Sequence, residues 1–244
     1  MRVVTTCHQE GYETYGQRWL DGRMKWPKGT QFWWYAEGYM LPRQPDEKSW
    51  PIVRRYVDDI PGLKEWKDKH PEPPKDWRWD VVRWSNKAFA PIDAFYDYDG
   101  VGVYLDADCV TYREIPDGLF EKQVKDHYLA CYQRTTLWTE AGIWIANCAR
   151  PENRPFLDRL RKMYFEDEWK TLPFWFDCLI MDQAIAWSGF AVNNLSGKFA
   201  GSHHPQALSE IGAYVDHPKG ERKVEGRSHE NVQRAEYESA HNGR

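Results

Sequence analysis

The stretch Val101-Gly-Val-Tyr-Leu105, followed at once by Asp106-Ala-Asp108, decides the fold class of this chain. Its five residues are apolar or small on both faces, which is typical of a strand buried in the middle of a parallel sheet. Parallel sheets occur almost only in α/β proteins, where helices cover both faces. The stretch therefore predicts an α/β fold, with the two aspartates at the carboxyl end of a central strand.

The N-terminal residues predict a strand-helix-strand unit. Arg2–Cys7 is a short β-branched strand, Tyr12–Trp26 has a helical pattern, and Gln31–Ala36 is an aromatic-rich strand. A strand, a helix and a second strand in this order form a crossover that joins parallel strands. We therefore expect a Rossmann-like, mixed but mainly parallel sheet that is flanked by helices.

The segment at about residues 39–80 predicts an insertion. Seven prolines lie between Tyr39 and Trp79. Within this segment, the charged stretch near Lys64–Lys69 favours a short helix. Ser85 is then a candidate N-cap for a helix that runs to about Tyr96, with Pro91 bending it.

The remaining sequence predicts one domain and a tail. We expect helices near 117–128, 155–165 and 176–187, and strands at 142–147 and 191–195. The domain is expected to span residues 1–223. Residues 224–244 are strongly charged and poor in apolar side chains, so we expect a tail that does not pack.

Composition excludes several classes of protein. With 33 Lys and Arg against 37 Asp and Glu, the 244-residue chain has a net charge of −4, which argues against coating nucleic acid by bulk charge. The five cysteines form no C-x-x-C pair, which excludes a zinc ribbon and favours the reducing cytoplasm. There is no apolar run of about 18 residues, so we expect neither a membrane span nor a signal peptide. The 14 Trp and 14 Tyr build either the core or flat stacking surfaces for sugars or bases.

Asp106 and Asp108 are the first candidates for chemistry. Ligands of open α/β sheets bind beyond the carboxyl ends of the strands, where both aspartates are expected. Two carboxylates separated by one residue can hold a divalent cation, which bridges them to a diphosphate and offsets its charge. For an isolated D-x-D pattern, a solvated turn is the alternative.

Four segments resemble the GT-A glycosyltransferases, which use nucleotide-diphospho-sugars. Val103–Asp108 resembles their metal-binding D-x-D at a strand end, and Arg83–Lys87 resembles the segment that carries a donor-contacting lysine. Asp182-Gln183 and His217-Pro-Lys-Gly220-Glu-Arg-Lys223 resemble the D-Q pair and the H-x-x-G-x-x-K motif of the glycogenin and lipopolysaccharide galactosyltransferase group. The chain is also similar to glycosyltransferase-like proteins of bacteria and their phages.

The resemblance implies a role for each motif. It assigns a divalent metal to three side chains: Asp106, Asp108 and His217. It assigns the diphosphate and sugar of the donor to a further set: Lys87, Asp182, Gln183, Gly220 and Lys223. Imidazole beside two carboxylates suits Mn²⁺ better than Ca²⁺, so Mn²⁺ is the expected cofactor, with Mg²⁺ as the alternative. His203 and His204 are competing sources of the metal histidine.

Other polar residues complete the candidates for donor binding. Thr5 and Thr6 end the first strand, where their hydroxyls can bond to a base or ribose, although ordinary turn chemistry explains them as well. Arg83 lies one helical turn before Lys87, so a helix would present both positive charges to a diphosphate.

Two carboxylates are candidates on the acceptor side. Glu140 or Asp177 could deprotonate an acceptor hydroxyl if the reaction inverts the anomeric configuration, although Asp177 could instead only cap its helix. Three tryptophans lie near them in the sequence and could stack on a sugar or a base: Trp138, Trp144 and Trp175.

Together these features predict a metal-dependent glycosyltransferase that moves a sugar from a nucleotide-diphospho-sugar, expected to be UDP-linked, to an acceptor hydroxyl. The acceptor could be a glycan, a protein or a modified phage DNA base, and the resemblance implies retention of configuration. The location is expected to be the cytoplasm, or the host cytoplasm for a phage protein. A nucleotidyltransferase and a non-catalytic nucleotide-sugar-binding module are the alternatives, because a fold and a metal motif do not fix the reaction.

Overall fold

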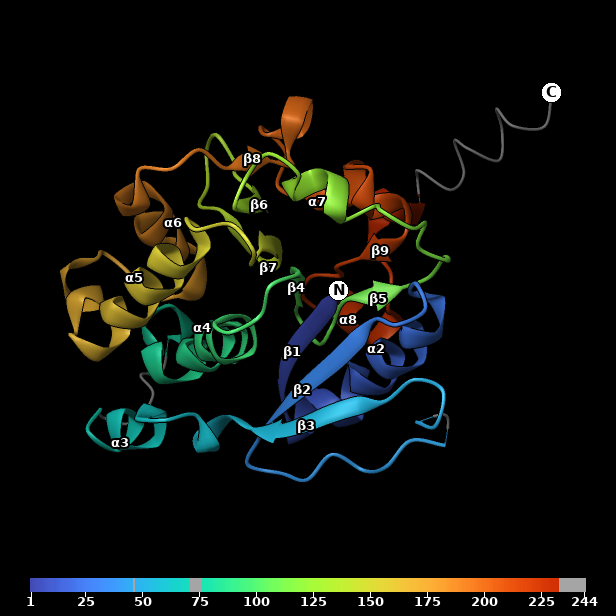
Figure 1. The fold of residues 1–244 in the computed structure, drawn as a ribbon, viewed down its shortest axis with the longest axis horizontal. Coiled ribbons are helices and arrows are strands. Elements are labelled where there is room, and N and C mark those ends of the chain that lie inside the picture. The colour runs from blue at the N-terminus through green and yellow to red at the C-terminus, as the bar shows by residue number, and fades with distance from the viewer. Residues whose placement is uncertain (46, 71–75, 233–244) are drawn as a thin grey trace.

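A computed structural model describes residues 1–45, 47–70 and 76–232. Seven strands within these residues form one sheet in the order β3-β2-β1-β4-β7-β6-β8 (Figure 1). The strands are β1 (Arg2–His8), β2 (Gln31–Glu37), β3 (Ile52–Tyr56), β4 (Val101–Leu105), β6 (Leu129–Tyr132), β7 (Glu140–Asn147) and β8 (Asn193–Asn194).

The sheet is mixed, and its N-terminal half is parallel. β1 pairs in parallel with both β2 and β4, and β3 extends β2 in parallel. β7 is antiparallel to β4 and to β6, whereas β8 is parallel to β6. The predicted fold class is therefore confirmed, with β4 at the centre of the sheet. The start of β7 meets the end of β4, because an antiparallel partner begins where its neighbour ends.

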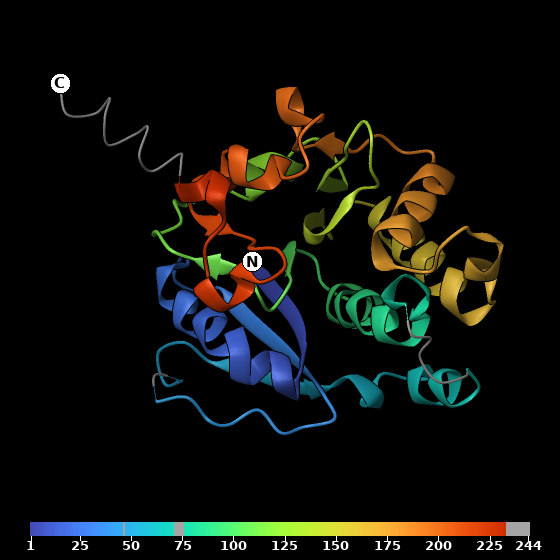
Figure 2. The same cartoon turned by 180° about the vertical axis from the view of Figure 1, so that it is seen from behind.

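Helices cover both faces of this sheet (Figures 1 and 2). On one face lie α4 (Val81–Phe95), α5 (Asn153–Phe165) and α6 (Asp177–Ser188), where Phe89, Phe156 and Ile180 share a core with Trp144 of β7. The other face is covered by a helical run of α1 (Gln9–Gly11), η1 (Tyr12–Gly16), α2 (Gln17–Gly22) and η2 (Arg23–Lys25). Successive residues of β4 serve the two cores, since side chains alternate across a strand.

Helix α4 begins earlier than predicted. The side chain of Asp80 accepts a hydrogen bond from the backbone N–H of Arg83 at 3.0 Å and caps the helix. The prediction of Ser85 as the N-cap is therefore wrong, because Ser85 is buried inside the helix and its hydroxyl donates to the Val82 carbonyl. Pro91 lies within α4, as expected.

The insertion contributes a strand that the proline-rich sequence did not indicate. It carries the edge strand β3, the predicted short helix as α3 (Leu63–Asp68), and two 3-10 turns, η3 (Val57–Asp59) and η4 (Trp77–Trp79).

The helix predicted near residues 117–128 is wrong. Only the 3-10 turn η5 (Glu121–Val124) forms there, and the strand β6 follows directly. Leu119, Phe120 and Val124 are buried in the core, so tertiary packing overrides local helix propensity here.

Shorter elements connect the main ones. They are η6 (Glu168–Thr171), η7 (Gly197–Phe199), α7 (Pro205–Leu208), η8 (Ile211–Ala213) and α8 (Arg222–Glu225), with β5 (Val110–Thr111) and β9 (Val215–Asp216) as an antiparallel pair. Among the residues that the structure describes, no helix combines the length and apolarity needed to cross a bilayer.

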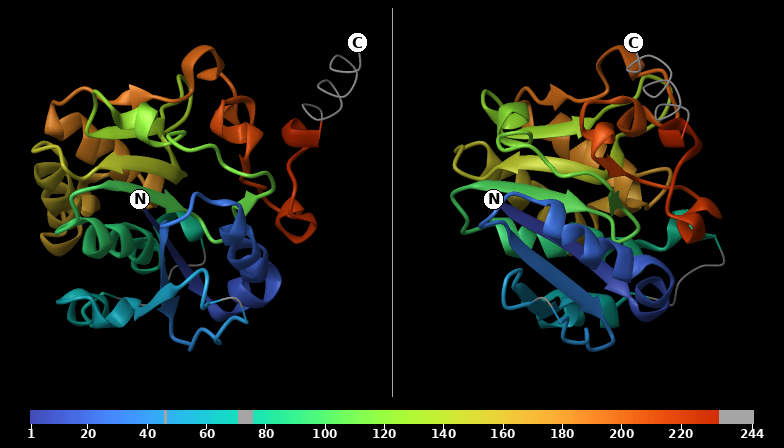
Figure 3. Two further views of the ribbon diagram at one scale, coloured as in Figure 1. Left: turned by 45° about the vertical axis from the view of Figure 1, so that its right-hand side comes forward. Right: turned by 90° about the vertical axis from the view of Figure 1, so that its right-hand side faces the viewer.

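The chain after Lys223 packs more than its composition suggests. Ser228 and Asn231 are buried, and Ser228 donates to the Asp216 carboxylate through both its backbone N–H and its hydroxyl. Arg18 of α2 donates to the Val224 carbonyl at 2.7 Å, and Figure 3 shows this C-terminal segment beside the N-terminal helices. The expectation of an unpacked tail therefore does not hold for residues 224–232, and its remainder, 233–244, lies outside the described residues.

Candidate active site

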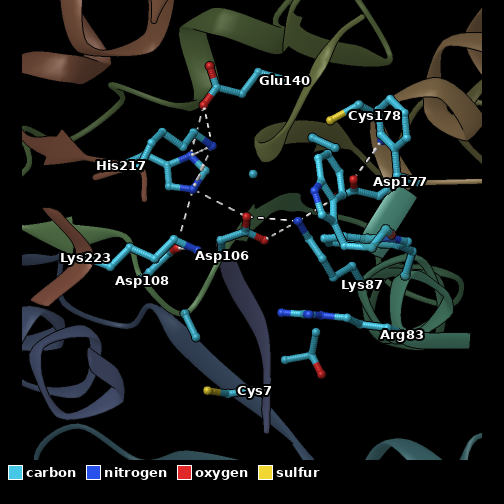
Figure 4. A pocket seen from close by; sticks show the side chains of 18 of the residues that line it. Cys7, Arg83, Lys87, Asp106, Asp108, Glu140, Asp177, Cys178, His217 and Lys223 are labelled. Atoms are coloured by element: carbon cyan, nitrogen blue, oxygen red, sulfur yellow. Dashed lines mark hydrogen bonds and ion pairs between the residues drawn. The ribbon is translucent and has the colours of Figure 1, made fainter. Parts of the chain in front are cut away.

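A cavity of about 740 Å³ opens where β1, β2 and β4 end and β7 begins (Figure 4). Most of the candidate residues predicted from the sequence line it: Thr6, Arg83, Lys87, Asp106, Asp108, Glu140, Asp177, His217, Gly220 and Lys223. The fold thus brings six separate segments of the chain to one place, at the edge of the sheet where ligands of α/β folds bind.

Asp106, Asp108 and His217 converge in this cavity. Nε2 of His217 lies 3.1 Å from Oδ1 of Asp108 and 3.4 Å from Oδ2 of Asp106. The histidine follows β9, which pairs with β5 just beyond the aspartates. Gly142 of β7 leaves room for the imidazole, since a Cβ at that position would lie 2.0 Å from Cε1 of His217.

A thiol lies beside this cluster. Asp108, Cys109 and His217 are all buried and can offer ligand atoms within 4.8 Å of one another. The Cys109 thiol is directed to the Gly142 carbonyl at 3.8 Å, and burial raises its pKa well above the usual range. Two carboxylates and an imidazole are therefore the better donor set for a divalent cation.

Glu140 supports the histidine from the other side. Its Oε1 lies 3.0 Å from Nδ1 of His217 and 3.0 Å from Nζ of Lys219. Glu140 is 1 % exposed, and its Oε2 has no hydrogen-bond partner among the described residues. A carboxylate on one imidazole nitrogen orients the ring and leaves the other nitrogen for a metal.

The charges of His217 and the two aspartates strongly shift one another's pKa values. Burial and Lys219 lower the pKa of His217, but Asp108 and Asp106 outweigh them and raise it to about 10. Burial raises the pKa of Asp108, but the charge and hydrogen bond of His217 lower it more, to about 2. Without a metal, a proton on His217 therefore compensates the aspartates.

Lys87 links this cluster to Asp177. Its Nζ lies 2.9 Å from the Asp106 carboxylate and 2.5 Å from Oδ2 of Asp177, the first residue of α6. Burial lowers the pKa of Lys87, but Asp106 and Asp177 raise it well above the usual value. Tyr104 donates to Asp106 at 2.9 Å and completes its hydrogen bonding.

Lys223 and Arg83 add further positive charge to the cavity. Nζ of Lys223 lies 2.6 Å from Oδ2 of Asp108. Gly220 has a φ of 60°, a left-handed conformation that glycine adopts without strain. Figure 4 shows Arg83 extending from α4 into the cavity, on the side where Cys7 of β1 lies.

Three of the residues predicted to bind the donor do not line the cavity. Asp182 accepts hydrogen bonds from the backbone N–H and the hydroxyl of Thr139, and Gln183 is exposed on α6. Both lie more than one helical turn beyond Asp177, which occupies the cavity instead. Thr5 is buried in β1.

The histidine alternatives also fall outside the metal cluster. Among the described residues, His217 is the histidine of the candidate metal group, and His203 and His204 are not part of it. Thr6 does line the cavity, but its hydroxyl donates to Glu37 at 2.8 Å.

Sequence reasoning missed several lining residues. Glu37 ends β2, and Tyr15 belongs to the helical run that follows β1. Glu37 could have been found from the rule that neighbouring parallel strands end at the same edge. Lys219 lies inside the H-x-x-G-x-x-K segment, where the motif leaves its position unspecified.

Comparisons with known proteins agree with the fold. No protein-family model matches the chain, and no curated protein matches its sequence. Among solved structures, the galactosyltransferase LgtC in complex with donor and acceptor sugar analogues is 13% identical, with 91% of this chain and 88% of that chain covered and a TM-score of 0.55. Mouse xyloside xylosyltransferase 1 is 8% identical, with 89% and 97% covered and a TM-score of 0.55. The glycosyltransferase GlyE of Streptococcus pneumoniae TIGR4 is 12% identical, with 80% and 45% covered and a TM-score of 0.51.

These likenesses define the class of fold. The chain has the GT-A glycosyltransferase fold, as the resemblance of its motifs implied. At such low identities the likeness concerns the fold, so function has to be argued from the cavity itself.

Proposed function

We propose that this chain is a metal-dependent glycosyltransferase that moves a sugar from a nucleoside-diphosphate sugar, UDP-linked, to an acceptor hydroxyl. The observation that carries the proposal is the convergence of Asp106, Asp108 and His217 at the end of the central strand of a GT-A sheet. Mn²⁺ is the proposed ion and Mg²⁺ the alternative, because the donor set combines two carboxylates with an imidazole.

The charge of the cavity supports a diphosphate ligand. Four carboxylates face the ammonium groups of three lysines and the protonated imidazole: Asp106, Asp108, Glu140 and Asp177 against Lys87, Lys219, Lys223 and His217. The four negative and four positive charges of this set cancel. A divalent cation in place of the histidine proton leaves an excess of positive charge, which an anionic diphosphate complements.

Each group then has a task in the transfer. The bond between the anomeric carbon and the diphosphate oxygen breaks, and its electron pair stays on the diphosphate. When bound, the cation supplies positive charge that stabilises this leaving group. Lys223 and the backbone at Gly220 add to that stabilisation, because both line the cavity beside Asp108.

For a transfer that inverts the anomeric configuration, Asp177 is the proposed acceptor of the proton. As the acceptor oxygen bonds to the anomeric carbon, its proton passes to the Asp177 carboxylate, which Lys87 holds in the cavity. Glu140, the other carboxylate proposed for this role, is engaged by His217 and Lys219 instead. We therefore assign Glu140 to orienting the histidine.

Calorimetry tests the metal assignment. We expect UDP to bind in the presence of Mn²⁺, and Asp108→Asn to abolish the Mn²⁺-dependent part of the affinity. The matched control is Asp97→Asn, since the Asp97 side chain is 86% exposed and pairs with Arg154 outside the cavity. Equal UDP affinity in wild type and Asp108→Asn would contradict the proposal.

Product analysis separates the alternatives. Slow hydrolysis of UDP-sugars with Mn²⁺ is expected for a glycosyltransferase. A nucleotidyltransferase would instead release pyrophosphate from UTP and a sugar phosphate, and a binding module would give neither product.

We also propose that the protein works in the cytoplasm, because its five cysteines are free thiols.

A further inference from the structure

Four aromatic side chains, Trp77, Trp84, Trp138 and Phe176, line one side of the cavity, and we name them the aromatic wall. Their rings are in continuous contact. Trp77 lies 5.9 Å from Trp84 and 5.6 Å from Phe176, and Trp138 lies 5.0 Å from Phe176, measured between ring centroids. Phe176 is buried, whereas Trp77 is 54% exposed. The indoles therefore present aromatic surface to the cavity and its rim.

The insertion builds the outer part of this wall. Trp77 belongs to η4, whose preceding residue Asp76 accepts from the backbone N–H of Arg78 at 3.0 Å. The carbonyl of Trp77 accepts from Nε1 of Trp84 at 2.7 Å, and the carbonyl of Arg78 accepts from the N–H of Trp175 at 2.8 Å. These bonds fasten η4 to α4 and to the segment before α6, so the wall is preformed.

The aromatic wall lies beside Asp177 and Lys87, the side chains proposed to lie near the acceptor hydroxyl. Phe176 immediately precedes Asp177, and Nζ of Lys87 lies 5.2 Å from the centroid of Trp84. The nucleotide side of the cavity is built from other elements, with Tyr15 following β1 and Lys223 on the C-terminal segment.

We propose that the aromatic wall is the acceptor subsite and that it binds a sugar ring. This inference rests on the proposed function and names the class of its acceptor. A pyranose has an apolar C–H face and polar hydroxyl edges, so it can stack on an indole and still present a hydroxyl to a carboxylate. Trp77 and Trp138 offer that surface, and Asp177 offers the carboxylate.

The charges near the wall favour a sugar over a nucleic acid. Nε and Nη1 of Arg134 donate to the carbonyls of Trp138 and His203, and Arg78 pairs with Asp76 at 2.6 Å. Single strands are bound by a positively charged groove that follows the phosphates along with stacking aromatics. Arg78 and Arg134 are engaged within the protein, Arg83 lies beside the wall at 5.3 Å from the ring centroid of Trp84, and the chain has a net charge of −4. One guanidinium beside the wall does not form the continuous basic groove that a single strand needs.

Saturation-transfer NMR with free sugars tests the proposal. The probes are lactose, maltose and cellobiose, each added to the full chain with UDP and Mn²⁺, and a single-stranded oligonucleotide that contains 5-hydroxymethylcytosine. We expect at least one sugar to bind. We also expect Trp77→Ala and Trp138→Ala to weaken its binding about tenfold, which is typical of a truncated aromatic contact. Thermal melts show whether each variant folds.

Trp187→Ala is the matched control, because Trp187 is 61% exposed and stacks on Arg159 away from the cavity. Sugar binding that both wall variants leave unchanged would overturn the proposal. So would binding of the oligonucleotide with no signal from any of the sugars, or no binding of either probe. Failure of the proposed function is a separate result, because it would appear as loss of Mn²⁺-dependent UDP binding in the wild type.

Discussion

The Glu140 carboxylate lies 3.0 Å from Nδ1 of His217, while Nε2 of the same ring lies 3.1 Å from Asp108. The two nitrogens of one imidazole thus face different partners, one at the start of β7 and one after β4. A hydrogen bond from Nδ1 to a carboxylate makes Nε2 a better electron-pair donor and fixes the orientation of the ring. Glu140 would therefore orient a ligand of the proposed metal site without itself contacting the ion.

We expect Glu140→Ala to weaken Mn²⁺ binding by about 10- to 100-fold, the range found when the supporting partner of a metal histidine is lost. Glu140→Gln should weaken it less, because an amide oxygen can still accept the Nδ1 hydrogen. Electron paramagnetic resonance of free Mn²⁺ measures both affinities, and thermal melts show whether each variant folds. If both variants lost the same Mn²⁺ affinity, the result would argue against a role of Glu140 in orienting His217.

Mn²⁺ binding should depend on pH. The aspartates raise the pKa of His217 to about 10, so at neutral pH the metal has to displace a proton. Affinity is therefore expected to rise about tenfold per pH unit between pH 6 and 8, with about one proton released per ion. Calorimetry in buffers of different ionisation enthalpy counts that proton. An affinity that is flat over this range would remove His217 from the ligand set.

The part of the fold that follows from local patterns could be predicted. The apolar run of β4 and the crossover between β1 and β2 identified the class, because both are encoded in consecutive residues. Strand β3 was not predictable in the same way. Its residues lie among prolines, and their strand conformation depends on pairing with β2.

The candidate site shows the same division. His217, Gly220 and Lys223 were found from a motif, whereas Lys219 and the aromatic wall depend on which elements the fold brings together. The D-Q pair was assigned from a motif, and a motif does not show which face of α6 turns to the cavity: Asp177 lines the cavity, whereas Asp182 accepts from Thr139.

Gly142→Ala should disrupt the metal site. Its added Cβ would lie 2.0 Å from Cε1 of His217 and 2.9 Å from Oδ2 of Asp106, so the histidine has to move. We expect Mn²⁺ affinity to fall at least as far as in Glu140→Ala, with about 1–3 kcal/mol lost from the free energy of unfolding. Gly201→Ala is the control, because its Cβ would lie 3.9 Å from Thr135. Equal Mn²⁺ affinity in the two variants would contradict the placement of His217.

Cys109→Ser should leave Mn²⁺ affinity within about twofold of wild type. The thiol lies in the candidate metal group, but it is directed to the Gly142 carbonyl, and burial and the charge of Asp108 raise its pKa well above the usual range. Competition between Mn²⁺ and Zn²⁺ provides the measurement. A large loss of Zn²⁺ affinity in this variant would identify a thiolate ligand, because thiolates select softer ions than Mn²⁺.

A chain that ends at Lys223 should lose most of its activity, although it keeps every motif residue. Ser228 donates to Asp216 at 2.7 Å and 2.8 Å, and Nδ2 of Asn231 donates to the Gly212 carbonyl at 3.1 Å. Removing Ser228 takes two donors from a buried carboxylate next to His217, and an unsatisfied buried group costs about 1–3 kcal/mol.

We therefore expect donor hydrolysis at saturating Mn²⁺ to fall at least tenfold in this chain, which corresponds to about 1.4 kcal/mol. A chain that ends at Val232 is the control, since it keeps all of these contacts and should stay within twofold of the full chain. Ser228→Ala removes only the hydrogen bond from the hydroxyl, so we expect its rate of donor hydrolysis to lie between the rates of the two shortened chains. If the chain ending at Lys223 hydrolyses donor at the full rate, the segment after it does not hold His217 in place, and β9 alone must position the histidine.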